Sequence, residues 1–469
     1  MKVFLLLWLQ TIQAELVLDK KQPRPLHIEY IPIDGGIITV SYKSPSSTRL
    51  FALHKYNADL RHEWSEELFD QSTGEEFIAL AVVDSQIWAF TQKVEGTRRI
   101  IYGYLANLQG RFSIRGKPLL NLESVPRTAR LELTYAPNRR YACLSIPIRA
   151  PADQPDKIAY ILLGGGSYIA GEWELPYREK EIEIRRPIQP GHEGHLYALG
   201  TVRTTNSPFP QYFLFKLAPE VSLTLSVLLE VEGIYLIEPT FRVERGGAVR
   251  IAAFYTQRRG AHQVQGLLFA RVESGFFLSN IRQTPLPTEV LQRFLSEKQI
   301  ARGRGIPDLF LDHLIPRGDG GMLLIGEQFY ITTSTFRDFY GFWYTQETYH
   351  YEDIVIFAID SVGSLEWFRV IPKAQVGTSD HELSYSLLVG PEKLYFFYRG
   401  YARGVGAQVF VIVLDAEGEL ASPRPFIPTF RGTDTFYRKL TRQLNNREGL
   451  LTYTESAGRR FVITRVSLD

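Results

Sequence analysis

Short runs of alternating β-branched and aromatic residues recur along almost the whole chain, separated by glycine, proline, asparagine and aspartate. Alternation with a period of two is typical of half-buried β-strands, and helical periodicity is nearly absent. Many runs come in pairs whose second member closes on Asp or Asn, two further residues and glycine, as in Asp360-Ser361-Val362-Gly363. The pattern predicts an all-β protein built from a repeated unit.

Aligning the paired strands gives eight units. The pairs lie at residues 35–40 with 49–53, 86–90 with 100–104, 141–147 with 158–163, 196–202 with 212–217, 249–255 with 266–271, 322–330 with 354–360, 394–398 with 409–415, and 450–454 with 461–466. Such a series predicts a β-propeller, with eight blades of four antiparallel strands. Seven blades are the alternative, because the unit at Tyr141 is divergent.

The last unit breaks off after two strands at Asp469, whereas an unassigned strand lies near the start, at 15–19. Because an open ring would leave unpaired strand edges, we expect this N-terminal strand to complete the C-terminal blade. Residues 1–14 have the pattern of a signal peptide, with Lys2, an apolar run too short to cross a bilayer, and the small Ala14. We therefore expect a single propeller domain at 15–469, exported to the periplasm or to the cell exterior or surface. A buried first strand is the alternative for the apolar run.

Charge and cysteine content narrow the function classes. The formal net charge is +2 and basic residues are scattered, so nothing indicates nucleic-acid binding. Cys143 is the only cysteine, which excludes intramolecular disulfides and zinc–cysteine sites and predicts a small core residue. No segment after the first residues reaches transmembrane length, so we expect no integral membrane segment.

Two long insertions interrupt the repeat. Residues 286–304, between two units, carry a helix signal with Thr288 as N-cap, apolar residues such as Val290, and Gly303 as the stop. Residues 330–353, inside the sixth unit, form the densest aromatic stretch. Connections between second and third strands share one propeller face with connections between blades. We therefore expect both insertions on one face, together with residues 373–375 and 399–403.

Rigid aromatic side chains interleaved with arginine are typical of protein interfaces and of platforms for sugar stacking. The sequence predicts a non-enzymatic protein-binding or scaffold subunit. The alternatives are a self-packed aromatic cluster, or a glycan- or polysaccharide-binding or -degrading propeller with Glu327 or Glu352 as acid. The expected partner-binding residues are Phe336, Arg337, Tyr340, Phe342, Trp343, Tyr344, Tyr349, Tyr351, Arg302, Arg304, Lys373, Gln375, Arg399, Tyr401 and Arg403.

Other candidate chemistry has an ordinary structural interpretation. Glu327 alternates in step with Ile325 and Phe329, which predicts a buried carboxylate held in an ion pair rather than a catalytic acid. His192 and His195 could bind a metal with Glu193, but they lie in a glycine-rich turn and not on the helix that a zincin site requires. We therefore predict no cofactor, no metal and no catalytic residue.

One region resembles a family of exported β-propeller proteins of Gram-negative bacteria that has no assigned activity. The resemblance is strongest over 286–397 and implies fold and export, without a catalytic residue to carry over. A looser similarity is to quinoprotein-like eight-bladed propellers, through the corner ending at Gly363 with Trp367, but their vicinal cysteine pair is impossible here. The motifs that carry the first resemblance are Asp319-Gly320-Gly321, Glu327-Gln328-Phe329-Tyr330, the aromatic stretch, and residues 353–360 and 371–375.

Overall fold

The computed structural model describes most of the chain. The described residues are 12–19, 22–43, 50–123, 125, 129–148, 156–175, 182–185, 188–202, 210–221, 223–258, 262–337, 339–402, 406–427 and 434–468. Most of the predicted signal peptide therefore lies outside the described residues, and its cleavage stays a prediction.

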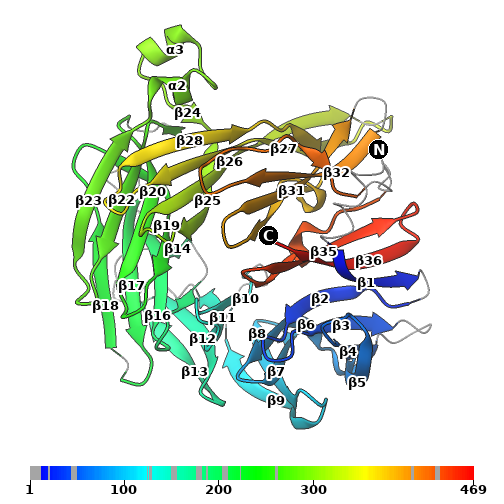
Figure 1. Ribbon diagram of the computed structural model, residues 1–469. Coiled ribbons are helices and arrows are strands. Elements are labelled where there is room, and N and C mark those ends of the chain that lie inside the picture. Colours follow the sequence, from blue (N-terminus) through cyan, green and yellow to red (C-terminus); the bar gives the residue numbers. More distant parts are fainter. Residues whose placement is uncertain are drawn as a thin grey trace.

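Antiparallel sheets follow one another in chain order (Figure 1), and eight of them, within the described residues, have four or five strands. Sheet 1 contains β2 (Pro25–Tyr30), β3 (Ile37–Lys43), β4 (Leu50–Tyr56) and β5 (His62–Asp70), and sheet 2 contains β6 (Glu76–Val83), β7 (Gln86–Glu95), β8 (Arg98–Asn107) and β9 (Phe112–Leu122). Sheet 3 contains β10 (Glu132–Tyr135), β11 (Ala142–Ile148), β12 (Lys157–Gly164) and β13 (Ser167–Glu174). Sheet 4 contains β14 (Ile182–Ile184), β15 (Gln189–Pro190), β16 (Leu196–Val202), β17 (Gln211–Ala218) and β18 (Leu223–Leu229).

The second half of the chain continues the series. Sheet 5 contains β19 (Tyr235–Val243), β20 (Val249–Thr256), β22 (Gly266–Val272) and β23 (Leu278–Pro285). Sheet 6 contains β25 (Leu309–Pro316), β26 (Met322–Arg337), β27 (Trp343–Ile359), β28 (Leu365–Ile371) and β29 (Gln375–Gly377). Sheet 7 contains β30 (Tyr385–Val389), β31 (Leu394–Ala402), β32 (Gly406–Leu414) and β33 (Arg424–Pro425), and sheet 8 contains β34 (Arg442–Asn445), β35 (Glu448–Glu455), β36 (Arg460–Ser467) and β1 (Ile12–Asp19). Short 3₁₀ turns lie at Gln71–Thr73, Asp380–Glu382 and Arg438–Leu440.

The sheets are arranged as the blades of a ring. First strands of neighbouring sheets contact one another: β2 contacts β6 and β34, β10 contacts β6 and β15, β19 contacts β25, and β30 contacts β34. The first strand of each blade therefore lies nearest the axis, and the later strands lie progressively outward. This confirms the predicted all-β propeller class.

The N-terminal strand joins the last sheet. β1 pairs antiparallel with β36, with Glu15 opposite Thr464 and Leu18 opposite Phe461. The Glu15 carboxylate also accepts hydrogen bonds from Tyr453 OH (3.2 Å) and Thr464 Oγ1 (3.3 Å). Residues at the two ends of the described chain thus belong to one sheet.

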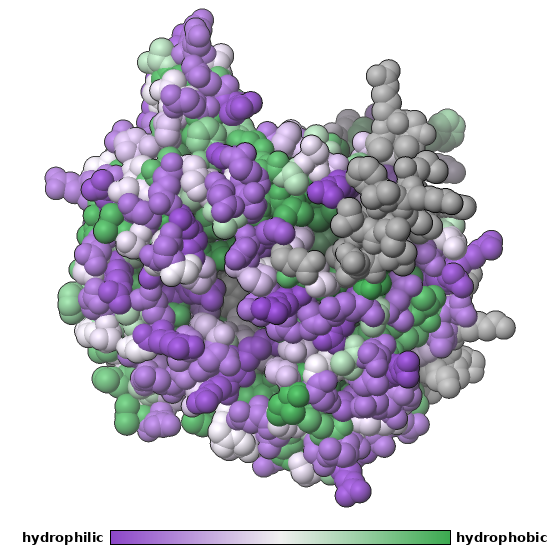
Figure 2. Space-filling model, in the orientation of Figure 1, coloured by the Kyte–Doolittle hydropathy of each residue, from purple (hydrophilic) through white to green (hydrophobic). Residues whose placement is uncertain are grey.

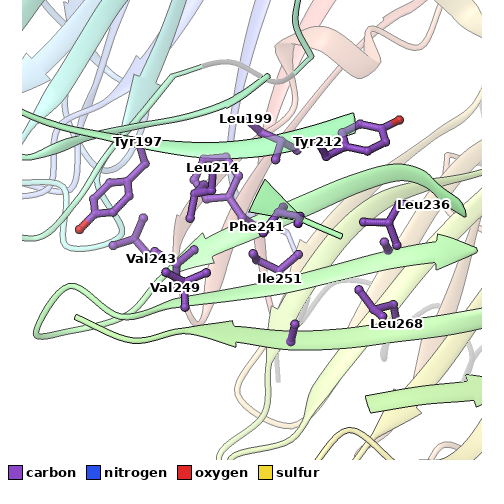
Figure 3. Close-up of a cluster of buried hydrophobic side chains, with 14 of the residues drawn as sticks. Tyr197, Leu199, Tyr212, Leu214, Leu236, Phe241, Val243, Val249, Ile251 and Leu268 are labelled. Carbon is purple, nitrogen blue, oxygen red and sulfur yellow. The ribbon is translucent and has the colours of Figure 1, made fainter. Parts of the chain in front are cut away.

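The core lies between the faces of adjacent sheets. Middle strands are buried on both faces, so every residue of β16 is buried, whereas the outer strand β23 is mostly exposed. Figure 3 shows one such layer, in which Leu199 and Leu214 of sheet 4 pack against Val249 and Ile251 of sheet 5. Cys143 is fully buried, as predicted, and burial raises the pKa of its thiol.

The recurrent corner is a side-chain-closed turn. Asn57 Oδ1 accepts hydrogen bonds from the backbone of Asp59 and Arg61, and Asn107 repeats this with Gln109 and Arg111. Such a side chain replaces a backbone partner and fixes the reversal between the third and fourth strands. The repeated Asp or Asn therefore has a structural cause.

The insertion at 286–304 is two short helices rather than one. α2 (Thr288–Leu291) follows Pro287 as N-cap, so Thr288 is the first helical residue and the predicted cap is wrong. α3 (Glu297–Ala301) begins after Ser296, whose backbone N–H donates to Gln299 Oε1 (2.9 Å), and this new cap divides the segment. Val290 is fully buried against the core between sheets 5 and 6, and the segment projects from the ring (Figures 1 and 2).

Candidate interaction surface

The middle strands of sheet 6 extend well beyond their neighbours. β26 and β27 stay paired as far as Arg337 opposite Trp343, whereas β25 accompanies β26 only to Gln328. β28 pairs with β27 only as far as Ile354, although the short β29 joins β27 at 349–351. We call residues 330–350 the aromatic hairpin, and it corresponds to the predicted insertion at 330–353.

Aromatic side chains at the end of the hairpin face solvent. The exposed fractions are 99% for Phe339, 83% for Tyr340, 72% for Phe342 and 69% for Trp343. Neighbouring rings brace one another: Phe336 stacks on Tyr344 with centroids 5.4 Å apart, and the Arg337 guanidinium lies 5.8 Å from the Trp343 ring. The aromatic residues therefore do not pack down onto the propeller as a self-contained cluster, and that alternative is wrong for this end of the hairpin.

The base of the hairpin is more tightly packed. Tyr330 and His350 stack with centroids 4.4 Å apart and planes only 7° from parallel. Phe329 and Tyr351 lie 4.5 Å apart, and Tyr351 and Tyr349 are half-buried. Tyr349 and Tyr351, which the sequence predicted as contact residues, therefore pack in the base of the hairpin and are less accessible than the rings at its end.

A buried ion pair lies directly beneath this base. Glu327 Oε1 is 2.5 Å from Lys373 Nζ, and their side chains are 4% and 1% exposed. Ser384 Oγ donates to Glu327 Oε2 (2.5 Å), while Lys373 Nζ donates to Tyr351 O (3.1 Å). Burial raises the pKa of Glu327 and lowers the pKa of Lys373, and the mutual attraction of the two charges opposes both shifts. The predicted buried, paired Glu327 is confirmed.

Lys373 and Gln375 are interior residues, so their predicted role as contact residues is wrong. Gln375 Oε1 accepts from Lys373 Nζ (3.0 Å) and from Ser384 N–H (2.7 Å), and Gln375 Nε2 donates to Arg399 O (2.7 Å). The connection from sheet 6 to sheet 7 folds inward and uses both side chains to join β26, β27 and β31.

The remaining predicted contact residues differ in availability. Arg302 and Arg304 are exposed beside α3, and Tyr401 is 79% exposed at the end of β31. Arg399 is paired with Glu382 and is only partly exposed. Arg403 lies outside the described residues.

The helical insertion is tied to a connection between second and third strands. β24 (Ile306–Pro307) pairs with β21 (Gln263–Val264), which lies between β20 and β22. Gln265 Nε2 also donates to Gly303 O (2.8 Å). This is the shared face that the propeller connection rule predicts, and the aromatic hairpin belongs to it by the same rule.

Histidine turns and a hollow mark the opposite face. A cavity of about 350 Å³ lies between sheets 3 and 4, lined among others by Tyr141, Tyr168, His195 and Glu220. Burial lowers the pKa of His195, and nearby Lys216 adds to this shift. Sequence reasoning missed this hollow, because its residues come from four separate turns. Within the described residues, no group of three or more His, Cys, Asp or Glu side chains could hold a metal ion.

Comparison with known proteins adds a likeness of fold. No protein-family model and no curated protein matches the chain. Similar solved structures include prolyl oligopeptidase B from Galerina marginata (10% identity, TM-score 0.43, 94% of this chain and 56% of that one). Another is the β-propeller domain of the Trilobed protease from Pyrococcus furiosus (10% identity, TM-score 0.38, 87% of this chain and 97% of that one). A third is a PL25 ulvan lyase (9% identity, TM-score 0.38, 88% of this chain and 97% of that one).

The chain spans little more than half the length of the prolyl oligopeptidase B structures, 55% to 56%. At such low identities these likenesses assign no activity to this chain. The resemblance to an exported Gram-negative family stays a prediction. No helix in the described part of the chain is long and apolar enough to span a membrane.

Proposed function

We propose that this protein is a binding or scaffold propeller that holds a protein partner through the aromatic hairpin. The observation that carries the proposal is the row of exposed rings at Phe339, Tyr340, Phe342 and Trp343. Aromatic side chains dominate the energetics of protein interfaces, and exposed apolar clusters on folded proteins typically mark contact sites. The buried ion pair at the hairpin base supplies a stiff foundation for these rings.

Export to the periplasm or the cell exterior is part of the proposal. It rests on the signal-like pattern of the first residues. A partner in the cell envelope or outside the cell would therefore meet this surface.

A glycan is the second candidate ligand. Trp343 and Tyr340 are exposed enough for a sugar ring to stack on them. Of the two acids expected for degradation, Glu327 does not fit, because it is buried and paired with Lys373. Glu352 on β27 is partly exposed. Glycan binding is the form of this alternative that the exposed rings support directly.

The test is affinity purification with the double variant Trp343→Ala/Tyr344→Ala. A partner recovered with the unmodified protein should bind at least about 30-fold more weakly to the variant, as expected when two interface aromatics are truncated. Phe277→Ala is the matched control, because Phe277 is also an exposed ring, 58% exposed, but lies in a turn on the opposite face. Both variants should melt at the temperature of the unmodified protein.

Unchanged recovery with Trp343→Ala/Tyr344→Ala would contradict the proposal. Binding of the unmodified protein to polysaccharides on an array, lost in the same variant, would instead favour the glycan alternative.

A further inference from the structure

A chain of three hydrogen bonds crosses sheet 1 from solvent to its interior. Ser41 Oγ lies 2.6 Å from His54 Nε2, and His54 Nδ1 lies 2.7 Å from Ser65 Oγ. The same Ser65 oxygen lies 2.6 Å from His62 Nε2. Ser41 is buried, His54 is partly exposed, and Ser65 and His62 are exposed. The His54 ring therefore connects a buried hydroxyl to a hydroxyl at the surface.

The buried end of this chain of hydrogen bonds faces sheet 8. β3 and β4 pair without a register shift, so Ser41 and His54 share a sheet face with Ile37 and Tyr56. Ile37 and Tyr56 pack in one core cluster with residues of sheet 8, namely Leu18, Leu450, Phe461 and Ile463. The hydrogen bonds thus lie at the junction between the first and the last sheet.

When both histidines are neutral, one arrangement of protons satisfies the whole chain of hydrogen bonds. Ser41 O–H donates to His54 Nε2, His54 Nδ1–H donates to Ser65 Oγ, and Ser65 O–H donates to His62 Nε2. The opposite direction would leave the Ser41 proton without an acceptor, because Ser41 Oγ has no second hydrogen-bond partner among the described residues. The buried end therefore requires an unprotonated His54 Nε2.

A proton on His54 would break this arrangement. Nε2 would become a donor, so the Ser41 hydroxyl would lose its acceptor, and a positive charge would be partly withdrawn from water. Burial lowers the pKa of His54, and the nearby His62 lowers it further. The folded protein therefore keeps His54 neutral at pH values at which an unfolded histidine already takes up a proton.

The neighbours of His54 on sheet 1 supply no counter-charge. Glu67 shares its sheet face, but it is exposed on the outer strand β5 and forms no ion pair with His54. Tyr30 and Tyr56, on the same face, are neutral phenols near neutral pH. His62 would repel a second positive charge.

Sheet 8 presents apolar residues, a tyrosine and a paired glutamate to this junction, together with two arginines. Leu18 of β1 and the ring of Tyr437 belong to the shared core cluster. Arg442 on β34 donates to a backbone oxygen of β2 (3.0 Å), and Arg465 on β36 pairs with Glu448 (2.7 Å). Neither arginine could stabilise a further positive charge.

We propose that these hydrogen bonds make the junction between sheets 1 and 8 sensitive to acid, so that proton uptake by His54 loosens the junction and frees β1. In this step the hydrogen bond from Ser41 O–H to His54 Nε2 breaks, and Nε2 binds a proton taken from solvent. β1 responds because it is the outermost strand of sheet 8, with Leu16 and Leu18 packed in the shared cluster. The inference is independent of the aromatic hairpin and of its ligand.

Urea unfolding of the full chain between pH 5 and pH 8 tests this sensitivity. Since the pKa of His54 is lowered in the folded state, its full contribution to stability is present above the ordinary histidine pKa, about 6.5, and is lost as pH falls below it. Uptake of one proton should raise the unfolding equilibrium constant by up to about tenfold per pH unit.

Two variants isolate this part of the pH profile. His54→Gln keeps a hydrogen-bonding side chain but takes up no proton, so its unfolding should depend less on pH between 5 and 6.5. Ser41→Ala removes the hydroxyl that requires an unprotonated Nε2, so it should also weaken the dependence. His381→Gln is the matched control, because the His381 side chain is 73% exposed and lies on sheet 7's approach. That variant should keep the original profile.

Hydrogen exchange measured by mass spectrometry locates the effect. After correction for the intrinsic exchange rate, peptides covering β1 and β36 should lose protection about tenfold between pH 7.5 and pH 5.5 in the unmodified protein. The same peptides should keep their protection in His54→Gln, and peptides from sheet 5 should change in neither protein.

Parallel pH profiles for the unmodified protein and His54→Gln would overturn the inference. An equal loss of protection in all sheets, or unchanged protection of β1 in acid, would also overturn it. If His54→Gln does not fold, Ser41→Ala decides the matter, since an undiminished pH dependence in that variant would contradict the role given to the buried hydroxyl.

Discussion

The pair Glu327 and Lys373 shows how a single buried charge depends on its neighbour. Both side chains are withdrawn from water, and each charge is satisfied only because the other lies 2.5 Å away. Removing two ions from water costs free energy, so the pair adds little net stability to the fold. Losing one member, however, leaves the other as a buried charge without a counter-charge, which is strongly destabilising.

Replacing Lys373 by methionine should therefore lower the free energy of unfolding by about 3–5 kcal/mol, since the Glu327 carboxylate would remain buried without a counter-charge. The double variant Glu327→Leu/Lys373→Met should recover most of that loss. Urea unfolding monitored by tryptophan fluorescence measures both. Lys157→Met is the surface control, because Lys157 pairs with the partly exposed Glu172 and should change stability by under about 1 kcal/mol. Equal destabilisation in the single and double variants would contradict the argument.

Residue positions were predictable where alternation decides them. The burial of Glu327 follows from its step with Ile325, and the exposure of Trp343 follows from its place in a long hairpin. The burial of Lys373 and Gln375 was not predictable, since a polar connection between blades is normally exposed to solvent. Whether this connection folds inward depends on contacts with residues such as Ser384 and Tyr351, which only the folded structure brings next to it.

At the scale of elements, Arg465 is one of the residues that join sheet 8 to sheet 1. Arg465 on β36 donates to the backbone oxygens of Gly35 and Ala58, each at 2.8 Å, and also pairs with Glu448 (2.7 Å). Hydrogen bonds from Arg465 and Asn445 hold the pKa of Glu448 below its ordinary value, against an opposing effect of burial.

This shift gives the stability an acid dependence. Above the ordinary glutamate pKa, about 4.3, the ionised Glu448 makes its full contribution to the free energy of unfolding. That contribution is lost as pH falls through the lower pKa of Glu448 in the folded state. Glu448→Gln should therefore be less stable at neutral pH and lose less additional stability below about pH 4 than the unmodified chain. Urea unfolding at several pH values checks this. Parallel pH profiles for the two proteins would contradict it.

Removal of β1 tests the shared last sheet. Deleting residues 1–19 should destabilise the chain by at least about 2–4 kcal/mol, because Leu18 loses its burial and β36 gains an open edge. Deleting residues 1–11, which precede β1, is the control and should have little effect. Thermal unfolding of the two truncated proteins compares them, and equal melting temperatures would argue against a structural role for β1.

Element prediction succeeded where the repeat is regular. The paired strands expected from the sequence correspond to the second and third strands of each sheet, because these are buried on both faces and carry the strongest apolar signal. First and fourth strands such as β14 and β33 are only three and two residues long, so they leave little trace in the sequence. The helical insertion was divided by a local cap at Ser296 that competes with a continuous helix.

For the molecule as a whole, the propeller and the aromatic hairpin should be separable. The part of the hairpin at residues 331–347 contributes little to the core between blades, since nearly all its described residues are exposed. Replacing residues 331–348 by a short turn should leave the free energy of unfolding within about 1 kcal/mol of its original value. The same variant should lose partner binding in the affinity purification described above. A large fall in the melting temperature would show that the hairpin supports the ring.

The composition of the last sheet also has a consequence for biogenesis. Among the described strands, β1 is the first to be synthesised and its partner β36 is the last. The first strand must therefore remain available, without its native partner, until nearly the whole chain has been made. Contacts between such distant segments form slowly because loop closure must precede them. During synthesis and any export, a chaperone that covers an exposed strand would have the segment around Leu16 and Leu18 as its natural client.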